Sequence, residues 1–122
     1  MARTALEMSA AELKQYKPFS HKRQGDEFLF QQAWELARQA TSLLYEKFDA
    51  KRVLVFGSLL HLERFTHGSD IDIAVWGIPP EKFFKAVAKM IDLSPQFQID
   101  LVGAEYCSER LRQKIEKKGV AV

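Results

Sequence analysis

Two short stretches decide how this chain folds: Arg52–Ser58 (RVLVFGS) and Asp70–Trp76 (DIDIAVW). The first is a run of β-branched and aromatic residues that ends at a Gly-Ser pair, which is typical of a buried strand followed by a turn. The second alternates acidic and apolar residues at its start. Asp70 and Asp72 would therefore point to one face of a strand, and the isoleucines to the other. Eleven residues separate Ser58 from Asp70.

Helical patterns lie on both sides of these two strands. Apolar residues three to four positions apart predict an amphipathic helix over residues 26–48. Pro80 and Glu81 are typical of a helix start. We assign the buried face of that helix to four apolar residues, Phe84, Val87, Ala88 and Ile91. Gln98–Val102 (QIDLV) predicts a third strand, and residues 104–118 predict a last helix that ends at Gly119.

This order of elements predicts an α+β fold, with helices packed on one face of a small mixed β-sheet. We expect a mixed sheet because the connection between the first two strands is short. We divide the chain into residues 1–25, a short helix and a basic connector, and residues 26–122, a single domain. The short helix is predicted from Ser9–Glu12, which has the S-x-x-E form of a capping box.

Composition excludes several classes of protein. The longest apolar runs have only a few residues, whereas a membrane-spanning helix needs about 20. The N-terminus lacks the apolar stretch of a secretory signal. The single cysteine, Cys107, can form neither a disulfide framework nor a CxxC zinc site. The 18 basic and 16 acidic residues are not distributed as in a sequence-specific DNA-binding protein. We therefore expect a cytoplasmic protein that binds neither membrane nor DNA.

Three aspartates are candidates for a metal site. Asp70 and Asp72 would share one face of a strand, and like charges at that distance repel unless a cation compensates them. Carboxylates with some retained water are the ligands that Mg²⁺ prefers. The third predicted strand carries Asp100 between two apolar residues, and adjacent strands would place it on the same face. Solvated acids on an edge strand remain the alternative.

Gly57 and Ser58 are candidates for binding a phosphate. Glycine permits a close approach to the backbone, the free N–H groups of a helix start bind anions, and Ser58 adds a hydroxyl donor. Arg64, in the loop before the acids, is a further candidate nucleotide-binding residue. The alternatives are a plain turn and a solvated arginine.

These parts together resemble a known superfamily. They are Val55-Phe56-Gly57-Ser58, then Asp70-Ile71-Asp72, and then Asp100. Over residues 50–120 the chain resembles the nucleotidyltransferases of the DNA polymerase β type. It is most similar to the minimal nucleotidyltransferases (MNT), whose antitoxin members pair with HEPN-domain ribonuclease toxins. The spacer before the acids is one residue longer than is usual in the family. Leu60 and Leu62 stand where the family usually has a small residue and a glycine.

The resemblance implies a mechanism and a partner. Asp70 and Asp72 would hold two Mg²⁺ ions, and Asp100 would join one of them and help to activate the attacking hydroxyl. The reaction would move a nucleoside monophosphate, with AMP from ATP as the first expectation, to a hydroxyl of a HEPN-type toxin. Two alternatives stay open: a catalytically inactive antitoxin that acts by contact, and a small-molecule nucleotidyltransferase. The base preference and the oligomeric state, whether homo- or hetero-oligomeric, stay open too.

Overall fold

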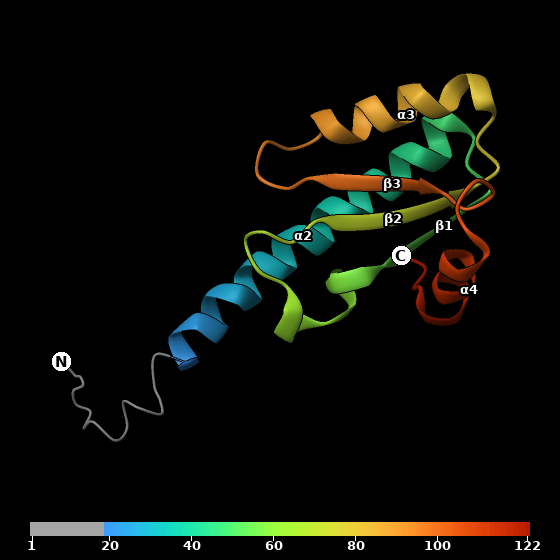
Figure 1. Cartoon of the computed structure of the whole chain (residues 1–122). Helices are drawn as coiled ribbons and strands as arrows, with labels where there is room; N and C mark the ends of the chain where they lie inside the picture. Colours follow the sequence, from blue (N-terminus) through green and yellow to red (C-terminus); the bar gives the residue numbers. More distant parts are fainter. Residues whose placement is uncertain (1–18) are drawn as a thin grey trace, which may run out of the picture.

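The computed structural model describes residues 19–122 (Figure 1). Its elements are α2 (Phe19–Phe48), β1 (Arg52–Phe56), the 3-10 turns η1 (Gly57–Leu60) and η2 (Leu62–Arg64), β2 (Ile71–Trp76), α3 (Pro80–Asp92), β3 (Ile99–Gly103) and α4 (Glu109–Lys118). The helix predicted at Ser9–Glu12 lies outside the described residues. Among the described helices, none has the length and apolar character needed to cross a membrane.

Helix α2 begins earlier than the sequence predicted. It spans Phe19–Phe48 rather than residues 26–48, so residues 19–25, which we had assigned to the basic connector, are helical. Gly25 does not break the helix, because a single glycine in a helix costs only about 1 kcal/mol relative to alanine. The proposed boundary between residues 1–25 and 26–122 therefore falls inside a helix.

The three strands form a mixed sheet, as predicted, and their order in it is β1-β2-β3. β1 runs antiparallel to β2, and β2 runs parallel to β3. Helix α3 supplies the long crossover that a parallel pair requires. The outer edge of β1 is covered, because Val55 exchanges two backbone hydrogen bonds with Val120 of the C-terminal tail. The N–H of Val53 donates to the hydroxyl of Tyr45 on α2 at 3.0 Å.

Helices cover both faces of the sheet, which corrects the expectation of helices on one face. The main core packs α2 and α3 against alternate strand residues, among them Val53, Val55, Ile71, Ile73, Val75 and Ile99. The opposite face carries a smaller cluster, in which Ile115 of α4 packs on Leu54 and Ala74. Helix α4 begins at Glu109 rather than at residue 104, because Ser108 caps it: its Oγ accepts the N–H of Leu111 at 3.1 Å.

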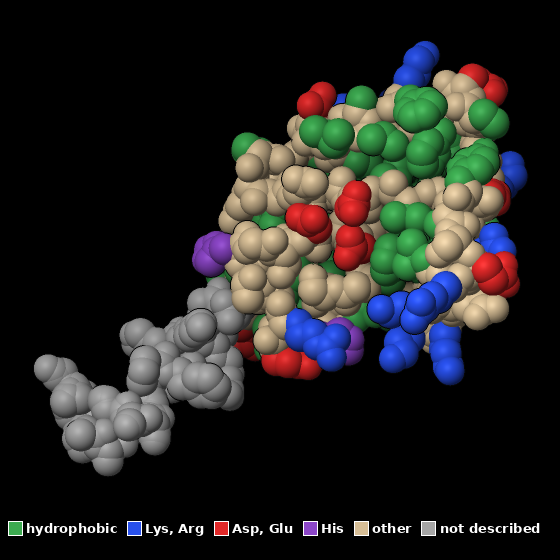
Figure 2. All heavy atoms as spheres, viewed as in Figure 1, with side chains coloured by type: hydrophobic (Ala, Val, Ile, Leu, Met, Phe, Trp, Pro, Cys, Tyr) green, Lys and Arg blue, Asp and Glu red, His purple; other side chains and the backbone are tan. Residues whose placement is uncertain are grey.

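Helix α3 buries a different side from the one predicted. Ala86 and Met90 are buried, whereas Phe84 is 80% exposed and Ile91 is 58% exposed. Phe84, Ala88 and Ile91 lie four and three residues apart, so they form one line along the exposed side of the helix. Figure 2 shows hydrophobic side chains gathered on the surface of α3. The helix has two apolar sides, and their spacing alone could not show which one faces the sheet.

Candidate functional site

Asp72 and Asp100 share one face of the sheet. Asp72 on β2 pairs in register with Asp100 on β3 and, on its other side, with Phe56 at the end of β1. Residues directly opposite each other on neighbouring strands point to the same face. Asp70 lies two positions before Asp72, just outside the strand. Figure 2 shows a group of acidic side chains in the middle of the face that is turned to the viewer. The predicted adjacency of the two acidic strands is confirmed.

The three carboxylates interact electrostatically. The pKa of Asp72 is raised from 3.8 to about 6, chiefly because burial removes water from its carboxylate, and further by the negative charges of Asp100 and Asp70. Both neighbours are thus close enough for their charges to act on Asp72. Such a group is costly when fully ionised, and a nearby cation offsets that cost.

The turn after β1 lies against this acid group. Gly57 has a φ of 80°, a backbone conformation that favours glycine. A Cβ added there would clash with the carboxylate oxygen Oδ2 of Asp72. A glycine at this position is therefore what allows the backbone and the carboxylate to lie so close together. Ser58 follows in η1, so the turn that the sequence predicted is present.

Helix α2 holds this turn in place. The indole N–H of Trp34 donates to the backbone carbonyl of Leu59 in η1 at 3.0 Å, and the side chain of Leu59 is fully buried. The rings of Phe30 and Phe65 meet edge to face at 5.9 Å, which joins α2 to the segment after η2. The sequence predicted an amphipathic helix here, but not this contact with the turn. The hydrogen bond from Trp34 spans 25 residues, so no local pattern could have revealed it.

Arg64 is not joined to the acid group. It ends η2 with an exposed side chain. In the part of the chain that the structure describes, the ion pairs involve other residues. A contact between Arg64 and a phosphate therefore stays a prediction.

The acid group fits a divalent cation by the chemistry of its donors. Within the described residues, no three acidic, histidine or cysteine side chains are placed closely enough to hold a metal ion as they stand. Yet the carboxylates of Asp72 and Asp100 lie in register, and the charges of Asp70 and Asp100 both act on Asp72. Aspartate side chains move between staggered rotamers. We therefore expect the three to converge on a cation by a change of rotamer.

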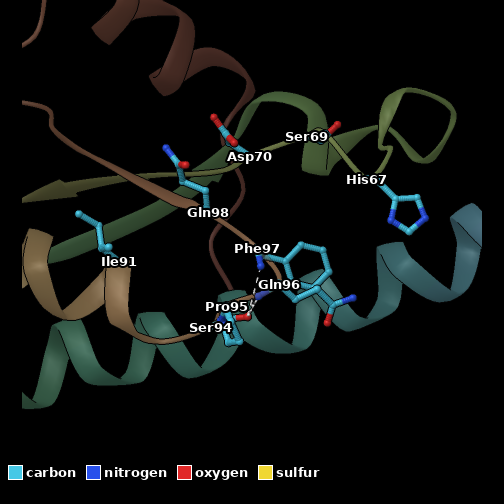
Figure 3. Close-up of a pocket in the computed structure, with 10 residues that line it drawn as sticks. His67, Ser69, Asp70, Ile91, Ser94, Pro95, Gln96, Phe97 and Gln98 are labelled. Atoms are coloured by element: carbon cyan, nitrogen blue, oxygen red, sulfur yellow. Dashed lines mark hydrogen bonds between the residues drawn. The ribbon is translucent and has the colours of Figure 1, made fainter.

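A cavity of about 480 Å³ opens beside Asp70 (Figure 3). Its walls come from the segment before β2, the end of α3 and the segment that leads into β3. They include Ser69, Ile91, Gln96 and Gln98. The ten lining residues include no lysine or arginine. The sequence could not reveal this cavity, because its walls come from segments that are separated along the chain.

Comparison with known families gives a match that covers most of the chain. The profile of a family described as "Polymerase beta, Nucleotidyltransferase" matches residues 38–122. The matched segment includes the three strands, the turn at Gly57 and the three aspartates. No curated protein matches the chain.

Proposed function

Because the chain belongs to the polymerase beta nucleotidyltransferase family, we propose that it transfers a nucleoside monophosphate from a triphosphate to a hydroxyl of a partner protein. We expect ATP to be the donor, and the reaction depends on Mg²⁺. The register of Asp72 with Asp100, beside the turn at Gly57, is the observation that carries the proposal. Such a reaction needs a cation site next to a phosphate-binding turn, and the acid group lies next to the turn.

Each part of the site has a task in this reaction. Asp70, Asp72 and Asp100 would hold two Mg²⁺ ions, which when bound neutralise charge on the phosphates and in the transition state. The backbone at Gly57 and the hydroxyl of Ser58 donate hydrogen bonds to phosphate oxygens. Transfer of this kind depends mostly on positioning and on charge neutralisation, and these residues supply both.

The bonds exchanged are simple. The acceptor oxygen forms a bond to the α-phosphorus, and the bond from that phosphorus to the bridging oxygen of the β-phosphate breaks. Pyrophosphate leaves with the electron pair. Asp100 is exposed on the outer strand β3. We assign its carboxylate to accept the proton of the acceptor hydroxyl.

We further propose that the partner is a HEPN-type toxin and that this chain is its cytoplasmic antitoxin. The exposed line of Phe84, Ala88 and Ile91 on α3 supports a protein partner. Contiguous exposed apolar surface of this kind marks protein–protein contacts.

Mass spectrometry of a HEPN-domain toxin co-expressed with this chain tests the proposal. The toxin should gain the mass of one or more nucleoside monophosphates. Asp72→Asn should abolish the gain, and Asp92→Asn, an exposed aspartate of α3 outside the acid group, should keep it. An unmodified toxin that Asp72→Asn neutralises as well as the parent would show that the chain acts by contact alone.

A further inference from the structure

We propose that the cavity beside Asp70 binds the nucleoside half of the triphosphate, and that side-chain amides in its wall set the base preference. The inference rests on the proposed function and adds to it. A nucleoside triphosphate has one strongly anionic half and one uncharged half. The acid group, with its cation, suits the first half. The adjoining cavity, whose wall carries no lysine or arginine, suits the second.

The cavity lies where the nucleoside must be. A single ester bond joins the nucleoside to the α-phosphate, so the nucleoside has to lie next to the acid group. Asp70 belongs to both the cavity and the acid group, because it lines the cavity and its charge acts on Asp72. The pairing of Ile71 with Ile99 places Asp70 opposite Gln98. In Figure 3 the side chains of Asp70 and Gln98 project to the same side.

The wall has the chemistry that a nucleoside needs. Gln96 and Gln98 each offer an amide that both donates and accepts, which matches the mixed donors and acceptors of a base edge. Ile91 and Pro95 supply apolar surface for the face of a ring. The volume of about 480 Å³ falls within the range of small-molecule sites, roughly 300–1,000 Å³. Because the wall carries no lysine or arginine, it does not favour the phosphates.

The wall is also held in place before any ligand binds. The Oγ of Ser94 accepts the backbone N–H groups of Gln96 and Phe97, at 3.0 and 3.3 Å. The ring of Phe97 is buried, and its centre lies 6.1 Å from that of Phe65. Gln98 is exposed and its amide takes no part in these contacts, so changing it leaves these supports intact.

Titration calorimetry with defined probes tests the assignment. The probes are ATP, GTP, CTP, UTP and inorganic tripolyphosphate, each with excess Mg²⁺ at one ionic strength. The parent should bind at least one nucleotide about tenfold more tightly than tripolyphosphate, which corresponds to 1.4 kcal/mol. Ile91→Trp, which fills the cavity from an exposed helix position, should abolish this advantage and leave tripolyphosphate affinity unchanged. Gln98→Ala should reduce the differences among the four nucleotides.

Ser42→Trp is the matched control, because it adds an indole to an exposed position of α2 outside the cavity and outside the partner surface. It should bind every probe as the parent does. If Ile91→Trp binds the nucleotides as tightly as the parent, or if the parent binds tripolyphosphate as tightly as every nucleotide, the cavity does not hold the nucleoside and the proposed function still stands. If the parent binds neither nucleotide nor tripolyphosphate, the proposed function fails, and the assignment of the cavity fails with it.

Discussion

The carboxylate of Asp72 lies directly against the backbone of Gly57, at the point where β1 turns into η1. The space between them has no room for a Cβ on residue 57, and the φ of 80° there favours glycine. The acid from β2 and the turn from β1 therefore form one unit. A change that moves the turn also moves a carboxylate on which the proposed reaction depends.

Gly57→Ala should abolish nucleotidyl transfer and destabilise the fold only modestly. The new methyl group displaces the Asp72 carboxylate, and the left-handed backbone costs roughly 1–2 kcal/mol for a residue with a Cβ. Gly77→Ala is the control, because Gly77 also has a positive φ, of 83°, and its Cβ would meet the side chain of Lys51, outside both the acid group and the cavity. Transfer assays and urea denaturation check both variants. Parental transfer by Gly57→Ala would show that the turn does not position Asp72.

Asp72→Asn should stabilise the metal-free protein at high pH and not at low pH. The pKa of Asp72 is raised to about 6 in the fold, so the folded state favours the protonated carboxyl. The stability that Asp72 contributes is fully present below its ordinary pKa and is lost as the pH rises through about 6. The difference between a pKa of 3.8 and one of about 6 corresponds to roughly 3 kcal/mol, and we expect about 1 kcal/mol because water screens a half-exposed group.

Urea denaturation with a chelator measures this difference. Near pH 8 the variant should be the more stable protein, and near pH 4 the two should be alike, with Asp92→Asn as the control outside the acid group. A gain of the same size at both pH values would mean that the charge of Asp72 is not its source.

Trp34→Phe should impair transfer although Trp34 does not touch the acids. It removes the hydrogen bond to the carbonyl of Leu59 and so loosens η1, at a cost of about 1 kcal/mol. Tyr45→Phe removes another hydrogen bond between α2 and the sheet, the one from Val53, which does not involve the turn. It should cost similar stability and leave transfer intact. Equal loss of transfer in both variants would assign the effect to general destabilisation.

Thr41→Val should stabilise the protein by about 1 kcal/mol. The Oγ1 of Thr41 is buried on α2 and has no hydrogen-bond partner among the described residues. Valine has nearly the same shape and no polar atom to bury. Thermal unfolding should show a higher midpoint for the variant, and a lower one would mean that the hydroxyl has a partner in solution.

The positions of the strands, and the aspartates that share a face, could be predicted from the sequence, because two-residue alternation fixes which side chains share a face. The same rule predicted that Asp100 joins Asp72, once the strands are adjacent. The buried side of α3 was not readable, since Phe84 and Met90 lie on different apolar sides and only packing against the sheet chooses between them. The predicted start of α4 was also wrong. Ala104 still donates its N–H to the carbonyl of Val75 and so belongs to the sheet rather than to the helix.

The central claim is that Asp70, Asp72 and Asp100 act together as a cation site for a nucleoside triphosphate. Electron paramagnetic resonance of Mn²⁺, titrated into the protein with an excess of nucleoside triphosphate, measures this binding directly. The parent protein should lower the signal of free Mn²⁺ further than the nucleotide lowers it by itself. Asp100→Asn should weaken that binding by about tenfold or more, which corresponds to at least 1.4 kcal/mol, with the fold retained in circular dichroism. If Asp100→Asn binds Mn²⁺ as tightly as the parent, β3 does not contribute to a cation site and the account is contradicted.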